Sequence, residues 1–263
     1  MSAAAAYDGF AETFADEAAG SAYNALYDRP TVLDLIGDVD GRRVLDAGCG
    51  PGLYLTELIA RGADAIGFDQ SADMVRHARR RLGPAVPVRR HDLDEPLDWL
   101  PDATIDLILA TLVIHYVHDR VAALRELHRV LRPQGRLVLS TSHPAADWLA
   151  DGGSYFDARH VDETWSCGLL HRYWRQPLQY WVEEFTAADF TIEHLVEHRP
   201  VPEMAHRYPA EYAKFPGPVM APEPGTARRS RTHPSHPLQG PRSDRPRSDR
   251  PTRRARQPPS GAR

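Results

Sequence analysis

Short apolar runs alternate with amphipathic stretches over most of the first 140 residues. Five apolar runs bounded by Gly, Pro or Asp predict buried strands at residues 43–46, 65–69, 86–89, 105–110 and 136–140. Apolar residues recurring every three or four positions predict helices at residues 56–61, 71–82 and 120–131. This alternation predicts an α/β fold with a doubly wound, mostly parallel sheet. Ligands of such sheets bind at the carboxyl ends of the strands.

The flanking segments follow other patterns. Aromatic and apolar markers predict helices between residues 7 and 36. Polar and aromatic residues mixed between His143 and about Leu170 predict a loop, and residues 177–189 predict a further helix. Residues 190–197 alternate between apolar and polar side chains, which predicts an antiparallel edge strand.

The composition changes near residue 222. Residues 223–263 hold eleven Arg against three acidic residues, a net of +8, so residues 1–222 carry −12 of the total of −4. A tail rich in Arg, Pro and Ser buries too little apolar surface to order itself, so we predict disorder there. Its charge suits nucleic acid or anionic lipid. The low-complexity composition favours instead a solvated tail or a shifted reading frame past the end of the domain.

Cysteine usage and hydropathy restrict the class of protein. Cys49 and Cys167 belong to no CxxC or Cys/His spacing, so we expect neither a disulfide framework nor a metal site. The N-terminus lacks a basic segment followed by an apolar one, and no run of about 18 apolar residues occurs. We therefore predict a cytoplasmic protein that does not act at a membrane.

A glycine-rich turn follows the first predicted strand. The run Val-Leu-Asp-Ala-Gly-Cys-Gly-Pro-Gly ends at Gly52, and Gly48, Gly50 and Gly52 allow a ligand to approach the backbone closely. The helix that follows offers free N–H groups to a negative group. A nucleotide-like cofactor is implied. The dinucleotide pattern G-x-G-x-x-G requires a third glycine where Leu53 stands, which argues against NAD.

The run from Asp46 to Gly52 resembles motif I of the class I S-adenosylmethionine-dependent methyltransferases. Three later segments match the same family in order, at residues 67–74, 90–93 and 127–137, although Gln134 stands where glycine is usual. The resemblance covers residues 40–142 and continues more weakly to about residue 200. It implies a seven-stranded Rossmann-like sheet with an antiparallel edge strand, and S-adenosylmethionine as cofactor. On this basis residues 1–222 form one domain, with a helical cap (1–36), a cofactor-binding core (37–142) and an acceptor-side segment (143–222).

The resemblance also implies roles for individual residues. Asp69 would accept hydrogen bonds from both ribose hydroxyls, and Asp46 would orient the methionine ammonium. Asp92 would accept from the adenine amine, Leu93 would offer its N–H to a ring nitrogen, and Met74 would pack on the adenine. Each aspartate could instead serve a turn or helix cap, and Met74 could be ordinary core. The predicted cofactor-binding set is Asp46, Gly48, Cys49, Gly50, Gly52, Asp69, Gln70, Met74, Asp92, Leu93 and Thr111.

Residues for the transfer step are harder to assign, because alignment of the reactants can supply most of the catalysis. A base is needed only when the acceptor keeps its proton at neutral pH. His115, after the fourth predicted strand, is the first candidate, as a base or to orient the acceptor; the alternative is a structural histidine. His143, after the fifth strand, is the second. Cys49 has no base tied to it and is better explained as small buried filler.

The sequence therefore predicts a methyltransferase that acts on oxygen or nitrogen of a small organic acceptor. The alternatives are C-methylation of a quinone-like precursor and a non-catalytic cofactor-binding module. An acidic body makes nucleic acid an unlikely acceptor, and the oligomeric state is open. Tyr7 and Tyr23 are candidates to close over the cofactor, as N-terminal aromatics do in similar enzymes. Aromatic residues expected around the acceptor are Tyr155, Phe156, Trp165, Tyr173, Trp174 and Trp181.

Overall fold

The computed structural model describes residues 7–164 and 170–215. Trp165 and the basic tail 223–263, about which the sequence makes predictions, lie outside the described residues. The chain divides by its internal contacts at residue 221, close to the change in composition. The architecture below is that of the first unit.

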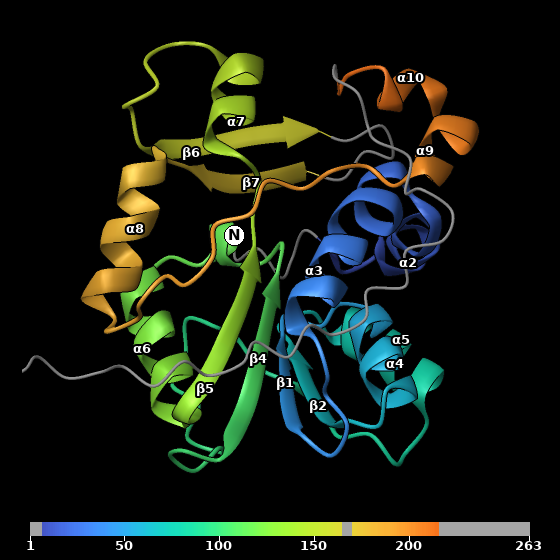
Figure 1. Ribbon diagram of the computed structural model, residues 1–263, viewed down its shortest axis with the longest axis vertical. Coiled ribbons are helices and arrows are strands. Elements are labelled where there is room, and N and C mark those ends of the chain that lie inside the picture. Colours follow the sequence, from blue (N-terminus) through green and yellow to red (C-terminus); the bar gives the residue numbers. More distant parts are fainter. Residues whose placement is uncertain (1–6, 165–169, 216–263) are drawn as a thin grey trace, which may run out of the picture. The chain divides into compact units, whose positions relative to one another are not determined.

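The centre of the fold is a five-stranded parallel sheet with strand order β3-β2-β1-β4-β5 (Figure 1). All five expected strands are present, so the α/β, doubly wound, parallel prediction is confirmed. The chain steps outward from β1 to β3 and then returns to β4, so the carboxyl ends of β1 and β4 meet at the point where the strand order reverses. The strands are β1 (Arg43–Ala47), β2 (Asp64–Asp69), β3 (Val88–Arg90), β4 (Ile105–Thr111) and β5 (Leu131–Ser140).

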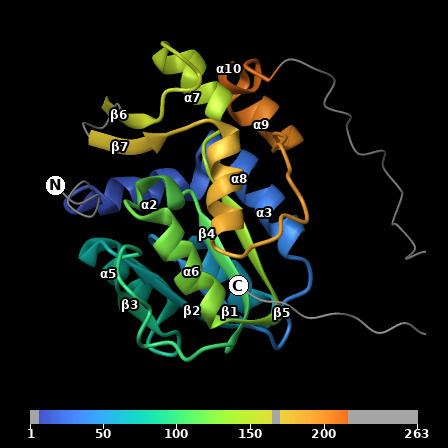
Figure 2. The same ribbon diagram turned by 90° about the vertical axis from the view of Figure 1, so that its left-hand side faces the viewer.

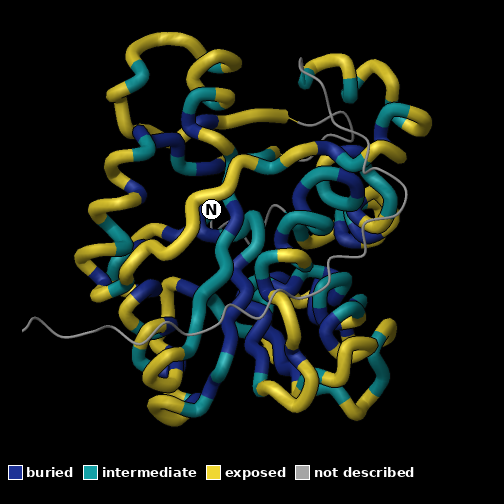
Figure 3. The backbone as a smooth tube through the Cα atoms, in the orientation of Figure 1, coloured by how far each residue is buried: buried dark blue, intermediate teal, exposed yellow. Residues whose placement is uncertain are grey.

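Each face of the sheet is covered by its own helices. In β1, Val44 packs among residues of one cluster and Leu45 among residues of the other, as expected from the two-residue period of a strand. The first cluster includes α3 (Arg29–Ile36), α4 (Leu53–Ala60) and α5 (Ala72–Leu82). The second includes α6 (Arg120–Val130) and α8 (Leu178–Ala187). Burial on both faces explains why the central strands are dark in Figure 3 and are continuous apolar runs in the sequence.

The N-terminal region is helical, as predicted, but it is not one helix. It consists of α2 (Ala11–Gly20), a π-helical turn η1 (Asn24–Asp28) and α3. Ser21 has an extended conformation that ends α2. Two short helices, α9 (Pro202–Arg207) and α10 (Pro209–Tyr212), follow late in the chain, and Met204 of α9 packs fully buried against Leu26 of η1.

The remaining strands differ from the prediction. The expected loop between His143 and Leu170 contains α7 (Pro144–Asp151) and β6 (Arg159–Thr164). Strand β6 pairs antiparallel with β7 (Leu170–Arg175) in a separate two-stranded sheet, here called the hairpin. The described residues thus contain seven strands, divided into five and two. The antiparallel pair is not the predicted one, because residues 190–197 form no strand. Phe190 is half-buried against the core, whereas residues 191–197 are exposed, so their apolar side chains have no face to bury.

Candidate functional site

The ends of the parallel strands bring the predicted cofactor-binding residues to one edge of the sheet. Asp46 lies at the end of β1, Asp69 at the end of β2, Asp92 just after β3 and Thr111 at the end of β4. In Figure 1 the arrowheads of β4 and β5 point from the sheet toward the hairpin. The carboxyl edge, with α2 and the hairpin on its outer side in Figure 2, is therefore the candidate site.

The glycine turn after β1 depends on close backbone packing. The N–H groups of Gly48 and Cys49 both donate to the carbonyl of Phe68 in β2 at 2.9 Å. Gly48 has φ +77, and a Cβ atom there would lie 2.5 Å from Cγ2 of Val113, which follows β4. Gly50 also has a positive φ, +52, but a Cβ there would meet nothing within 4 Å. Gly48 is thus needed for packing between strands, whereas Gly50 borders open space that a ligand can enter.

Asp46 is a buried acid that forms no ion pair with any described residue. Its side chain is fully buried, and neither carboxylate oxygen has a hydrogen-bond partner within the described residues. Burial, together with the negative charge of Asp69, raises the pKa of Asp46 to about 8. A buried acid in this state is stabilised by any cation that reaches it, because such a cation supplies both the charge and the hydrogen bonds that are lacking.

Asp69 is held by the turn and by the helix that follows it. Its Oδ2 accepts from the N–H of Gly50 at 2.8 Å, and its Oδ1 accepts from the N–H of Ser71 at 2.9 Å. Burial raises its pKa to about 6; the two backbone bonds oppose this shift, and the charges of Asp8 and Asp92 add to it. Each oxygen keeps a further lone pair for a ligand hydroxyl.

A short N-terminal segment, residues 7–10, closes one side of the site. The carboxylate of Asp8 accepts from the hydroxyl of Ser71 at 2.6 Å, and Gly9 donates its N–H to Asp73 at 3.1 Å. These bonds tie the segment to the first turn of α5, directly after Asp69. The neighbouring Tyr7 is close enough for the charge of Asp69 to raise its pKa, although burial is the larger cause of the rise to about 12.

The other predicted cofactor residues surround this centre. Met74 and Leu93 are buried, and Thr111 is half-buried at the end of β4. Asp92 accepts from the N–H of Asp94 through Oδ1 at 3.1 Å, and the carbonyl of Gln70 accepts from Arg90 at 3.0 Å. Their roles toward the cofactor stay predictions.

Cys49 has no access to solvent that would suit a nucleophile. Its side chain is buried, and a Cβ atom at Gly67 would lie 3.2 Å from its Sγ. Burial also raises the pKa of its thiol well above the usual value. These features agree with the sequence interpretation of a small buried filler.

The two candidate histidines occupy different environments. His115 is buried in the 3-10 turn η2 (Ile114–Tyr116), and its Nδ1 lies 3.0 Å from Oγ1 of Thr141. Burial lowers its pKa to about 3, so it is neutral and weakly basic, which suits orientation better than proton removal. His143 is exposed; its Nδ1 accepts from the N–H of Ala145 to cap α7, and its Nε2 lies 3.5 Å from Glu197. This is a structural role, and a catalytic role for either residue stays a prediction.

Three polar residues near His115 were missed in the sequence. The hydroxyl of Tyr116 lies 2.8 Å from that of Tyr7 and 2.6 Å from Nε2 of His171 in β7. On the other side of the His171 ring, Nδ1 lies 3.5 Å from Oε2 of Glu163 in β6. Tyr116 directly follows the predicted candidate His115, in the turn η2 after β4. His171 and Glu163 carry no sequence signal, because only the hairpin brings them here.

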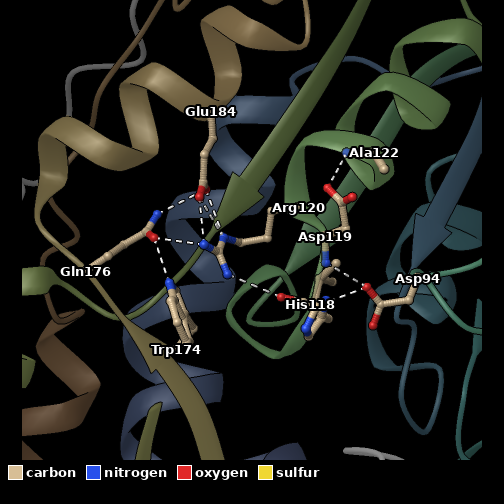
Figure 4. A network of polar contacts seen from close by, with 9 residues as sticks. Asp94, His118, Asp119, Arg120, Ala122, Trp174, Gln176 and Glu184 are labelled. Atoms are coloured by element: carbon tan, nitrogen blue, oxygen red, sulfur yellow. Dashed lines mark hydrogen bonds and ion pairs between the residues drawn. The ribbon is translucent and has the colours of Figure 1, made fainter. Parts of the chain in front are cut away.

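A buried network attaches the hairpin and α8 to the core (Figure 4). Arg120, at the start of α6, donates to both carboxylate oxygens of Glu184 in α8 at 2.6–3.0 Å, and to Gln176 at 2.9 Å. Its guanidinium also lies over the rings of Trp174 and Trp181. The network thus joins α6 to the end of β7 and fixes where the hairpin stands over the sheet.

Comparison with known proteins identifies the domain. The family model described as "Methyltransferase domain" matches residues 45–139, which run from β1 to β5 and contain the glycine turn and all the strand-end acids. Residues 45–139 form a class I S-adenosylmethionine-dependent methyltransferase domain. S-adenosylmethionine is therefore the cofactor of this domain.

Individual relatives of the methyltransferase differ in how much of it they match. An uncharacterized protein of Haemophilus influenzae is 26% identical over 73% of this chain and 87% of its own length. A trans-aconitate 2-methyltransferase of Azoarcus sp. is 40% identical over 48% of this chain. The chain spans only 46% of that enzyme and half or less of several other bacterial relatives. The crystal structure of an S-adenosylmethionine-dependent methyltransferase from Mesorhizobium loti shares the fold, with a TM-score of 0.59 and 24% identity over 75% of this chain and 93% of that one.

The described ranges, 7–164 and 170–215, lack two kinds of feature. No helix in them has the length and apolar character needed to cross a bilayer. They also contain no group of three or more His, Cys, Asp or Glu side chains arranged to hold a metal ion.

Proposed function

We propose that this methyltransferase transfers the methyl group of S-adenosylmethionine to an oxygen or nitrogen atom of a small organic acceptor. The observation that carries the proposal is Asp46, a buried carboxylate that has no hydrogen-bond partner in the part of the chain that the structure describes and lies beside an open glycine turn. The cofactor brings a primary ammonium group that can occupy this position and neutralise the acid. Asp69 has lone pairs left for the two ribose hydroxyls, so the residues present fit the cofactor.

The chain's own contribution to the reaction is mainly positional. The bound cofactor supplies a methyl group on a positively charged sulfur, and in-line displacement needs only a correctly aligned acceptor. Residues Tyr7, His115 and Tyr116 place aromatic surface at the carboxyl ends of β1 and β4, where an acceptor would meet the cofactor. The N-terminal segment and the hairpin would exclude water from this contact.

The first test is calorimetric titration of the full chain with S-adenosylmethionine, S-adenosylhomocysteine and NAD. We expect micromolar binding of the first two and none of NAD. If the chain binds neither sulfur compound, the proposal is refuted. Formation of S-adenosylhomocysteine with any member of an acceptor panel then separates a methyltransferase from a module that only binds the cofactor.

A further inference from the structure

Four polar side chains from distant parts of the sequence lie in one row beside the candidate site, joined by two hydrogen bonds and an ion-pair contact. Tyr7 comes from the N-terminal segment, Tyr116 from η2, His171 from β7 and Glu163 from β6. The successive distances are 2.8 Å between the two hydroxyls, 2.6 Å from Tyr116 to Nε2 of His171, and 3.5 Å from Nδ1 of His171 to Glu163. We call this set the relay.

The contact with Glu163 favours one arrangement of the protons in the relay. The carboxylate of Glu163 lies 3.5 Å from Nδ1 of His171 and favours the tautomer with the proton on Nδ1, which leaves Nε2 as an acceptor. Tyr116 must then donate its single proton to Nε2, and it accepts from the hydroxyl of Tyr7. All three donors therefore point toward Glu163. The oxygen of Tyr7 keeps a lone pair at the end of the chain, on the side where the charge of Asp69 reaches it.

We propose that the relay removes the proton of the methyl acceptor, which makes the acceptor a hydroxyl or amine compound rather than a carboxylate. This inference rests on the proposed function. As the acceptor oxygen or nitrogen forms its bond to the methyl carbon, the carbon–sulfur bond breaks and its electron pair stays on sulfur. The acceptor's O–H or N–H bond breaks, and its proton passes to Tyr7. The proton of Tyr7 passes to Tyr116, and that of Tyr116 passes to Nε2 of His171.

The other end of the relay reaches solvent. The side chain of His171 is 13% exposed, whereas that of Glu163 is 58% exposed. Glu163 stabilises the imidazolium that forms, and the proton then leaves through the exposed end of the hairpin to water. The relay thus joins a half-buried reaction site to bulk solvent.

The restriction on the acceptor follows from what each group needs. A carboxylate has already lost its proton at neutral pH and gains nothing from a relay, but it needs cations to bind it. Both arginines of the described hairpin strand β7 are occupied: Arg172 pairs with Asp162, and Arg175 donates to Asp151 and to the carbonyl groups of Gly152 and Ser154. This side of the site therefore favours an acceptor different from that named for the Azoarcus relative.

The basicity of His171 is set by groups on three elements. Burial lowers its pKa, and the hydrogen bond and charge of Glu163 from β6 raise it. From η2 it faces Tyr116 and His115, whose ring centre is 6.1 Å away, and on its own strand it stacks on Tyr173 at 4.8 Å. Replacing Glu163 by Gln removes the contribution that raises the pKa of His171. If His171 causes the acid limb in the pH profile of kcat, that limb should move to lower pH in this variant.

Kinetic measurements on the full chain test the relay. Wild type, Tyr116→Phe, His171→Gln and Glu163→Gln are assayed with phenols, aliphatic alcohols, primary amines, and carboxylates including trans-aconitate. We expect hydroxyl or amine acceptors to be preferred, and the first two variants to lower kcat on them by about 10²- to 10⁴-fold. The control is His160→Gln, a histidine of the same hairpin that packs on Trp174 outside the relay and should leave the rate unchanged.

Three results would overturn the relay. They are a carboxylate as the best acceptor, a kcat that neither Tyr116→Phe nor His171→Gln lowers, and an acid limb in the pH profile of kcat that Glu163→Gln does not shift. Cofactor affinity measured alongside separates the two proposals. Wild type that binds no S-adenosylmethionine refutes the proposed function, whereas binding together with relay-insensitive turnover refutes the relay alone.

If no compound of the panel is methylated, the relay can still be tested by a measurement that needs no acceptor. Nitrogen-15 NMR of the imidazoles distinguishes the two neutral tautomers. We expect His171 to carry its proton on Nδ1 in wild type, and the Nε2 resonance to move in Tyr116→Phe. A proton on Nε2 would reverse the direction of the chain and exclude the relay.

Discussion

Two aspartates at neighbouring strand ends have different pKa values because their surroundings differ. Asp69 accepts two backbone hydrogen bonds, and its pKa rises only to about 6. Asp46 has no such bonds, and its pKa rises to about 8. At neutral pH the first is therefore mostly ionised and ready to accept hydrogen bonds, while the second holds a proton that a cation can displace.

The ribose role of Asp69 gives the first prediction. We expect Asp69→Ala to weaken S-adenosylmethionine binding by about 1.5–3 kcal/mol, because hydrogen bonds to a charged acceptor are lost. Calorimetry measures the change. The control is Asp64→Ala at the opposite end of β2, where the side chain is exposed and 4.0 Å from Arg43. Equal affinities for the Asp69 variant and wild type would remove Asp69 from the cofactor site.

The second prediction concerns proton release. Because Asp46 is mostly protonated at pH 7, binding of the cofactor ammonium beside it should expel a proton. Calorimetry at pH 7 in buffers of different ionisation enthalpy counts that proton. We expect Asp46→Asn to bind more weakly and to release none. Release that persists in this variant would assign the proton to another group.

The same raised pKa affects stability, which gives the third prediction. The folded chain binds the Asp46 proton more tightly than the unfolded chain, so this contribution is complete below about pH 4. It is lost as the pH rises toward 8. We expect the free energy of unfolding of Asp46→Asn to exceed that of wild type at pH 8, by about 2–5 kcal/mol. Denaturant titrations of both proteins at pH 4 and pH 8 provide the measurement, and a gap that does not widen with pH would contradict the assignment.

Sequence reasoning succeeded for residues whose positions are set by local structure. Asp46 and Asp69 were found because each ends a strand, and strand ends of a parallel sheet share one edge. His171 and Glu163 were not found because they lie on a hairpin whose position depends on contacts with η2 and α8, far away in the sequence. His143 also stands at a strand end, and there its side chain caps the next helix, a contact that strand position alone does not predict.

At the scale of elements, Arg120 connects three parts of the fold, and it carries the fourth prediction. We expect Arg120→Met to lower the free energy of unfolding by about 3–5 kcal/mol, because Glu184 loses the partner of a largely buried charge. Denaturant unfolding measures this loss, and the double variant with Glu184→Leu should recover much of it. The control is Arg76→Ala, an exposed ion pair with Asp73 that should change little. A single variant as stable as wild type would show that the network adds no stability.

The success of strand prediction depended on burial. Strands β1, β2 and β4 are covered on both faces. Their sequences are therefore continuous apolar runs, which are easy to recognise as strands. Strand β6 buries only Val161, and its other side chains are polar and exposed, so no period was visible. Residues 190–197 alternate between apolar and polar side chains like a strand, but they pair with no neighbouring strand among the described residues. Alternation shows which side chains could be buried together, but a strand also needs a neighbour that supplies hydrogen bonds.

At the scale of the whole molecule, the acidic body and the basic tail give the fifth prediction. The proposed cofactor-binding residues lie between Asp46 and Thr111, so the chain ending at residue 222 should bind S-adenosylmethionine within about twofold of the full chain. Calorimetry on both forms measures this. A large loss of affinity would give the tail a part in the site. If the full chain binds nucleic acid, truncation should abolish that binding, because the remaining body is acidic.

The hairpin has a consequence for how the protein responds to heat. A lone two-stranded sheet has little stability of its own, and most side chains of β6 are exposed. The hairpin is held in place by its attachments to the core, the Arg120 network and the contact of Tyr116 with His171. On warming it should detach while the five-stranded sheet still holds its shape. Such a protein would retain its affinity for the cofactor at temperatures where it can no longer take a proton from its acceptor.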